Sequence, residues 1–316
     1  MGVNVGYSPP LTGIVLLGAL TLLWGVNWPA MKLGLSEVEP WTFRTLCLVT
    51  GGTGLLGIAK ARGHSLRISH QERWPICVVA LFNITGWHMF SAYGVALIHA
   101  GRAAIIAYTM PLWAVILGRV ILHEPLTRAR GLALLLGLAG LAILIGPELR
   151  SLWGAPAGAL LMVCAAVCWA AGTVLLKYFR WAMPTILLTG WQLILGGLPV
   201  IVGKFLLEPL PSLGDLSLKA AVGTAYAAVI GVLFCHYAWF KLVQMLPSGI
   251  AAIGTLGIPA VGVFSSGFIL GEPVGLRELT ALAVIVLALG MVLLRRSAGG
   301  SPSPRGPTRP ATDGRK

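Results

Sequence analysis

Charged residues are scarce in this sequence of 316 residues, and acidic residues are the scarcest of them. Aspartate, glutamate, lysine and arginine together make up 10% of the chain, whereas hydrophobic residues make up 57%. A soluble globular domain carries about 25% charged residues. The shortage argues against a soluble globular protein, because so apolar a chain could not cover its core with a polar surface.

Motifs of the common enzyme classes are also missing. The sequence contains no GxxxxGK[ST] phosphate-binding loop, no HExxH motif and no GxSxG motif. Its five cysteines all fall inside apolar segments, and Cys164 and Cys168 have no histidine or acidic residue beside them. We interpret all five as small, buried hydrophobic residues. The sequence therefore predicts that the chain is neither an enzyme nor an ATP-driven pump, and that it holds no metal or cofactor.

Long apolar runs make up most of the chain. Windows such as Leu11 to Leu23 and Leu279 to Leu294 hold at most one charge. Lipid accepts only helices or closed barrels, and these runs are too long for barrel strands. The sequence predicts an all-α polytopic membrane protein with ten transmembrane helices. The expected spans are residues 11–34, 38–60, 74–97, 100–122, 128–146, 155–177, 183–206, 218–242, 248–270 and 277–295.

The 23 basic residues lie mainly on one side of these spans. With a cytoplasmic N-terminus, 16 of them fall on the inner side and seven on the outer side, so the positive-inside rule places both termini in the cytoplasm. The seven outer residues lie at span ends or in loops and are Lys32, Arg44, Arg102, Arg150, Lys204, Lys219 and Arg277. The basic residues are scattered between spans and form no single stripe, which argues against nucleic acid as a partner. We expect residues 1–10 to form a cytoplasmic N-terminus and residues 297–316 a disordered, basic cytoplasmic tail.

The two halves of the chain repeat each other. Residues 103–125 and 251–273 share Ala103, Ala104, Pro111, Ile121 and Glu124-Pro125 at a constant offset of 148, and Trp24 aligns with Trp169 at an offset of 145. Each half, residues 11–146 and residues 155–295, holds five predicted spans. Because five is odd, the second copy enters the membrane upside down, and a site is expected near the midplane between the halves. A scaffold or sensor that transports nothing is the alternative of another class.

These features resemble the drug/metabolite transporter superfamily, and within it the ten-helix exporters with two EamA-type repeats. The resemblance covers about residues 11–295. It is carried by the WGVNW element at residues 24–28, the stretches from Pro111 to Glu124-Pro125 and from Pro259 to Glu272-Pro273, residues 93–97, and Trp191-Gln192.

The resemblance implies an inner-membrane exporter of amino acids or related metabolites, with a central cavity lined mainly by spans 1, 3, 4, 6, 8 and 9. The aromatic amino acid exporters are the branch it resembles most. A nucleotide-sugar or organic-cation carrier of the same superfamily is the alternative, although no cluster of inward-facing lysines or arginines is evident to hold phosphates.

Aromatic and amide side chains share helix faces in the predicted spans. Trp24, Asn27 and Met31 recur at helical spacing in span 1, and polar groups at such depth usually face a bundle interior or a wet cavity. For the amides and histidines a purely structural role stays open. An aromatic, mostly uncharged cavity suits a zwitterion or an organic solute. The predicted substrate-binding residues are Trp24, Asn27, Asn83, Trp87, His88, Tyr108, Trp113, Trp169, His236 and Tyr237.

Prolines and span-end carboxylates form a second predicted set. Pro29, Pro111 and Pro259 are expected to kink helices. Glu124 and Glu272 end matched spans and are expected to act as helix-end or gate residues on opposite faces. All ten acidic residues lie at span ends or in loops, which leaves His88 and His236 as candidates for proton coupling. Passive transport is equally compatible. The expected partners are a small-molecule substrate and membrane lipid, and a monomer is compatible with the sequence.

Overall fold

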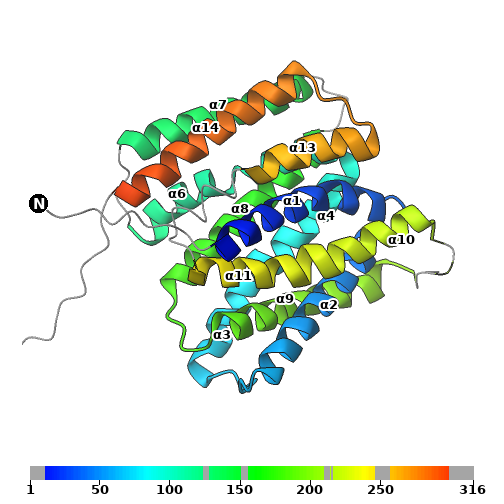
Figure 1. The fold of residues 1–316 in the computed structure, drawn as a ribbon, viewed down its shortest axis with the longest axis vertical. Coiled ribbons are helices and arrows are strands. Elements are labelled where there is room, and N and C mark those ends of the chain that lie inside the picture. Colours follow the sequence, from blue (N-terminus) through cyan, green and yellow to red (C-terminus); the bar gives the residue numbers. More distant parts are fainter. Residues whose placement is uncertain are drawn as a thin grey trace, which may run out of the picture.

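The computed structural model describes residues 11–123, 128–150, 156–209, 214, 216–245 and 257–298. Across these ranges every regular element is a helix (Figure 1). The predicted cytoplasmic N-terminus, nearly all of the predicted tail, and Glu124 lie outside them.

The helices of each half follow one another in the same order. In the first half they are α1 (Leu11–Gly34), α2 (Pro40–Ala61), α3 (His70–Ala80), η1 (Leu81–Gly86), α4 (Trp87–Leu97), α5 (Ala100–Ala107), α6 (Met110–Ile121) and α7 (Arg128–Arg150). In the second half they are α8 (Pro156–Tyr178), α9 (Thr185–Leu207), α10 (Leu218–Ala225), η3 (Tyr226–Phe234), α11 (Cys235–Met245), α13 (Gly257–Leu270) and α14 (Leu276–Ala298).

Within the described ranges, seven helical stretches are long and apolar enough to cross a membrane. Four are α1, α2, α8 and α9, and three are composite: α3–η1–α4, α5–α6 and α10–η3–α11. Helices α7, α13 and α14 occupy the positions of the other three expected spans, and the count of ten stays a prediction. Large apolar side chains cover the outside of the bundle, and Phe268 is 92% exposed. Such a surface is the one a bilayer solvates, so the chain is an integral membrane protein.

The predicted prolines have unequal effects on the helices. Pro111 stands at the second position of α6, directly after a break at Tyr108 and Thr109, as expected of a residue without an N–H. Pro259 lies in the first turn of α13. Helix α1, however, continues as one helix through Pro29. The cysteines also depart from expectation: Cys77 and Cys164 are exposed on the outside of the bundle instead of buried.

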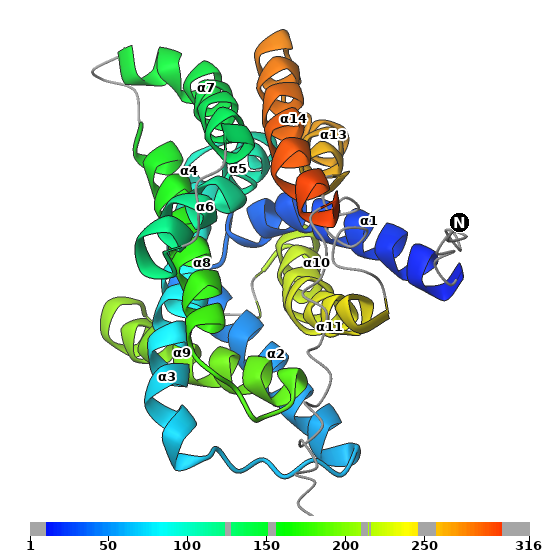
Figure 2. The same ribbon diagram turned by 90° about the vertical axis from the view of Figure 1, so that its left-hand side faces the viewer.

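The two halves pack through reciprocal contacts. Equivalent helices α2 and α9 lie against each other, as do α7 and α14 (Figures 1 and 2). Helix α1 packs on α13 and on the α10–η3–α11 stretch, while its equivalent α8 packs on α5, α6 and the α3–η1–α4 stretch. These contacts between the halves therefore have counterparts, as a two-fold relation between the repeats requires.

Polar contacts at the helix ends indicate the inversion. Glu208, at the end of α9, accepts hydrogen bonds from the backbone N–H groups of Trp41 and Thr42, at the start of α2, both at 2.8 Å. The equivalent helices α2 and α9 therefore run antiparallel.

A second pair of contacts shows the same relation with the partners exchanged. Glu37 accepts from the Ser217 N–H at 2.8 Å, and Glu72 accepts from the Ala182 N–H at 2.7 Å. At the offset of 145, position 37 corresponds to 182 and position 72 to 217. The same pair of repeat positions is thus in contact twice. In one contact the carboxylate stands at the first position of the pair, and in the other it stands at the second.

Two of the three composite spans, α3–η1–α4 and α10–η3–α11, contain a π-helix at matched positions. The first, η1, begins at Leu81 and ends at Gly86, and the second, η3, begins at Tyr226 and ends at Phe234. The two starts are 145 residues apart and the two ends 148. The three residues that separate the two offsets of the repeat are therefore accommodated inside the longer π-helix.

Candidate functional site

A cavity of about 430 Å³ lies between the two halves. It has the size of a small-molecule site. Its walls come from α1, α2, the η1–α4 stretch and the α5–α6 break in the first half, and from α8, α9 and the η3–α11 stretch in the second. Of the predicted substrate-binding residues, those that line it are Trp24, Asn27, Asn83, Trp87, His88, Tyr108, Trp169 and His236.

Aromatic rings form two clusters in the cavity wall, each shared between the halves. The Trp24 ring meets His236 edge to face, with ring centroids 5.7 Å apart, and lies 6.2 Å from Trp239. The Trp87 and Trp169 rings lie 5.1 Å apart. Such surfaces bind planar or apolar groups by stacking and bind ammonium groups through the ring faces.

The Trp24 side chain also fixes the second π-helix. Its indole N–H donates to the backbone carbonyl of Gly231 at 3.0 Å. A π-helix leaves carbonyls without their usual i+4 partner, and such segments occur mostly at functional sites. Trp24 thus serves both as cavity wall and as a partner of irregular backbone.

Two asparagines sit where helices of the two halves cross closely. The Asn27 side chain of α1 lies against Gly231 of η3, and Asn83 of η1 lies against Gly172 of α8. Asn83 also donates its amide N–H to Gln192 Oε1 at 3.3 Å. Positions 27 and 172 differ by 145 and positions 83 and 231 by 148, so the two crossings are equivalent. The asparagines therefore take part in packing between the halves as well as lining the cavity.

Two histidines face the cavity from equivalent positions. His88 and His236 are 148 residues apart, each two residues after a π-helix ends, and both are buried. Their ring nitrogens have no hydrogen-bond partner in the part of the chain that the structure describes. The sequence analysis predicted both histidines individually but did not recognise them as equivalent. Their separation of 148 residues, which equals one offset of the repeat, was the signal.

Arg44 is a cavity residue that the sequence analysis missed. Counted there among the outer span-end charges, it is in fact 2% exposed and lines the cavity from α2. Its Nε donates to the His88 carbonyl and its Nη2 to Ser91 Oγ, both at 2.8 Å. Among the described residues no carboxylate forms an ion pair with it. The available signal was an arginine inside the expected span of residues 38–60, since a charge within a span usually serves function.

Several predicted residues lie outside the cavity wall. The Trp113 indole donates to Thr109 Oγ1 at 3.1 Å and supports the start of α6. The Tyr237 hydroxyl accepts a hydrogen bond from Arg62 and its ring lies under that guanidinium, toward the end of α2. Pro111 lines the cavity, while Pro29 and Pro259 do not.

Lys32 and Glu272 bind helix ends at one face of the molecule, which we call the clamp face. The Lys32 ammonium donates to the carbonyls of Val95, Ala96 and Ile98 at the end of α4, at 2.8 to 2.9 Å. Glu272 accepts from the N–H groups of Ala100 and Gly101 at the start of α5, at 2.8 and 3.0 Å. The Lys32 cation thus lies at the C-terminus of α4, and the Glu272 anion lies at the N-terminus of α5. The helix dipole favours a positive charge at the first position and a negative charge at the second. The clamp joins the halves, because Glu272 belongs to the second.

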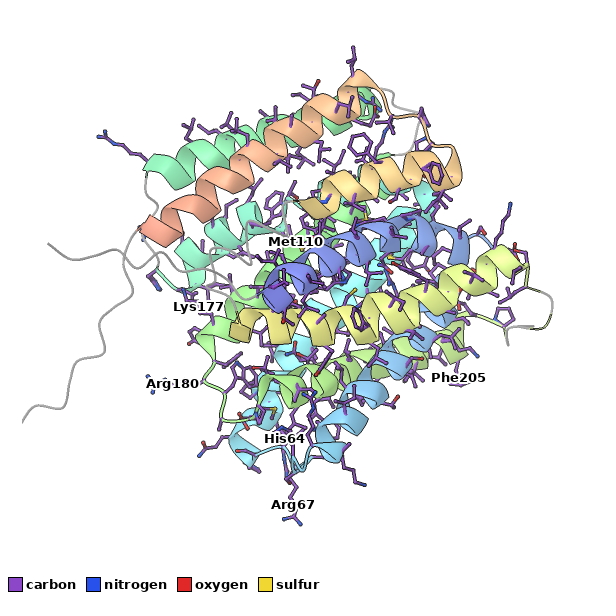
Figure 3. The ribbon with its side chains drawn as sticks, viewed as in Figure 1. His64, Arg67, Met110, Lys177, Arg180 and Phe205 are labelled. Atoms are coloured by element: carbon purple, nitrogen blue, oxygen red, sulfur yellow. The ribbon has the colours of Figure 1, made fainter. Side chains whose placement is uncertain are left out.

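The cavity extends toward the opposite face. Its lining includes Leu176 near the end of α8 and Thr185 at the start of α9, so it reaches the level of the α8–α9 connection. Lys177 and Arg180 lie on this side of the molecule (Figure 3). Lys32 and Glu272 are not among the described lining residues, which reach instead toward the α8–α9 connection.

Comparison with known proteins identifies similar chains. The model of the EamA-like transporter family matches residues 11–146 and 156–294, once for each repeat. The uncharacterized transporter YvbV of Bacillus subtilis is 29% identical over 298 residues, which cover 92% of this chain and 94% of that protein. The uncharacterized transporter YoaV of the same organism is 24% identical over 280 residues, 88% of this chain and 96% of that one.

A solved structure shows the same fold. It is titled only as the crystal structure of a protein, and it is 22% identical to this chain. The two superpose with a TM-score of 0.65 over 92% of this chain and 99% of that one.

Proposed function

The chain belongs to the EamA-like transporter family, and from this premise we propose that it exports amino acids and related metabolites by alternating access through the central cavity. The amino acids we propose are aromatic ones and other neutral ones such as methionine and threonine.

The lining of the cavity is the observation that supports this proposal. It combines tryptophan rings with the amides of Asn27, Asn83 and Gln192, and no carboxylate is among its described lining residues. Rings hold an apolar side chain, while amides and a buried arginine supply hydrogen bonds for polar ends. A neutral amino acid has both parts, and the volume of the cavity suits a solute of that size.

The repeat supplies the two-sided mechanism. In this structure Lys32 and Glu272 clamp one face, and the cavity extends toward the other. Their equivalents are Lys177 at an offset of 145 and Glu124 at 148. We propose that these two residues close the opposite face in the alternate state, when the clamp of Lys32 and Glu272 has opened.

The proposed orientation follows from the basic residues. The positive-inside rule places the termini in the cytoplasm of a cell whose inner membrane holds the protein. The clamp face is then external, and the cavity is directed at the cytoplasm, where an exporter loads. Coupling to protons through His88 and His236 and passive transport are both compatible with this arrangement.

Other functions fit the site less well. A nucleotide sugar needs several cations for its phosphates, whereas Arg44 is the one basic residue among the described lining residues. An organic cation would meet that arginine with no carboxylate to attract it. A scaffold without a transport function would be expected to pack its centre, and the cavity of about 430 Å³ argues against one.

The proposal is tested by flux into liposomes that contain the purified protein. Radiolabelled phenylalanine, methionine and threonine are compared with and without a pH gradient, using Trp24→Ala and His88→Ala as cavity variants. Trp74→Ala is the matched control, since Trp74 is 75% exposed on α3. Saturable flux that the cavity variants weaken and the control does not supports the proposal. Flux no higher than in empty liposomes for all three amino acids would contradict the proposed transport of amino acids.

A further inference from the structure

Arg44 is held with part of its hydrogen-bonding capacity directed into the cavity. Its bonds to the His88 carbonyl and to Ser91 Oγ fix the guanidinium against α4. A guanidinium has five N–H donors in a planar fork. On the cavity side, Nη2 also lies 3.8 Å from the thioether sulfur of Met31.

The same sulfur is the target of a second donor. The amide nitrogen of Asn27 donates to Met31 Sδ at 3.3 Å. Two donors from different helices, one of them charged, thus converge on one weakly accepting atom. All three side chains line the cavity. Two N–H donors that converge on one point can also hold a carboxylate oxygen. Here that point is filled by the Met31 side chain, which is flexible because it has three rotatable bonds.

We propose that Arg44 and Asn27 bind the carboxylate of the transported solute, which takes the place of the Met31 sulfur. This inference rests on the proposed transport function and narrows its substrate to a carboxylate-bearing solute. A carboxylate makes short, charge-assisted bonds to arginine, in two parallel contacts where geometry allows. It also supplies the negative charge that a buried guanidinium without an ion-pair partner otherwise lacks.

The position of this site also orients the solute. The Trp24 cluster lies on the same helix as Asn27, one turn away, and meets His236 and Trp239 of the second half. A carboxylate held at Arg44 would leave the rest of an aromatic amino acid to reach these rings. The two halves would then share one solute, as alternating access requires.

Three matched compounds test the assignment. L-Phenylalanine has both charged groups, 3-phenylpropionate lacks the ammonium, and phenethylamine lacks the carboxylate. Isothermal titration of each into the purified full-length protein is expected to show phenethylamine binding at least about tenfold more weakly than the two carboxylates, or about 1.4 kcal/mol. Equal or tighter binding of phenethylamine would overturn the assignment and leave transport of organic solutes intact. Binding of none of the three would overturn the proposed amino acid function, and the assignment with it.

Variants separate an anchor from a structural residue. Arg44→Gln is expected to lower affinity for the two carboxylates at least about tenfold and leave phenethylamine unchanged. A purely structural role would instead weaken all three compounds together, which would contradict the assignment. Arg44→Lys should retain the preference for carboxylates at reduced affinity. Met31→Leu should retain or tighten carboxylate binding. Arg73→Gln, at an exposed position of α3, is the matched control.

Discussion

The two crossings of asparagine and glycine predict opposite outcomes for the same substitution. At Gly231, an added Cβ would lie 2.2 Å from Asn27 Oδ1 and 2.8 Å from its Cγ. These atoms form the far end of a side chain that can rotate. At Gly172, an added Cβ would lie 2.5 Å from Asn83 Cβ and 2.9 Å from its Cα, so the backbone of η1 itself must move.

The magnitudes follow from these atoms. Overpacking costs about 1 to 3 kcal/mol and more where backbone must shift, while replacing a helical glycine by alanine gains about 0.5 to 1 kcal/mol. Gly57→Ala is the control, because Gly57 is exposed on α2 with nothing within 4 Å of the added Cβ. We expect the free energy of unfolding to fall most for Gly172→Ala, less for Gly231→Ala, and to stay equal or rise for Gly57→Ala.

Double variants sharpen the test. Asn27→Ala removes the atoms that collide at Gly231, so it should rescue Gly231→Ala. Asn83→Ala keeps the Cβ and Cα that collide at Gly172, so it should not rescue Gly172→Ala. Unfolding in mild detergent by titration with sodium dodecyl sulfate, followed by tryptophan fluorescence, measures each. Rescue at Gly172, or a Gly172→Ala variant as stable as Gly57→Ala, would refute the reasoning.

Three further outcomes are expected from the clamp and the helix ends. Lys32→Met removes the cation that binds three carbonyls and should open the clamp face. A cysteine placed at Ser91 should then react at least about tenfold faster with a membrane-impermeant thiol reagent added on that face. An unchanged reaction rate would contradict the role of Lys32 in the clamp. Glu272→Gln removes the charge at the start of α5 and should lower the free energy of unfolding by about 0.3 to 1 kcal/mol; no change would contradict this role. The Ser217 hydroxyl and N–H hold the pKa of Glu37 below its ordinary value, so this carboxylate stabilises the fold above that ordinary value and stops doing so as the pH falls through the lowered pKa. Glu37→Gln should therefore unfold more easily than the parent at pH 7 but equally at acidic pH; an equal difference at both would contradict it.

Much of the architecture could be predicted from the apolar runs and the internal repeat of the sequence. The apolar runs predicted helices where α1, α2, α8 and α9 occur, because lipid permits few alternatives. The break before Pro111 followed from a missing N–H. The π-helices were not predicted, because their sequences carry no local signal. The only sign of them in the sequence was the change of the repeat offset from 145 to 148. The structure shows that this change falls within the π-helices, at Leu81–Gly86 and Tyr226–Phe234.

The site was harder to predict, because lining depends on how helices turn toward each other. Helical spacing placed Trp24 and Asn27 on one face, and both line the cavity. Trp113 and Tyr237 have the same residue chemistry but face elsewhere. Arg44 was missed because a basic residue near a span end was counted as a topology signal. Its depth becomes visible only when α2 packs beside α4.

Alternating access between the two halves is the central claim, and a reversible cross-link tests it most directly. A Cβ at Gly101 of α5 would lie 3.3 Å from Val263 Cα of α13, close enough for a disulfide between cysteines at these positions. In a chain freed of its native cysteines, oxidation of this pair should hold the clamp face shut. We predict that phenylalanine flux falls to the level of empty liposomes and that a reducing agent restores it. Undiminished flux through the oxidised protein would contradict the account.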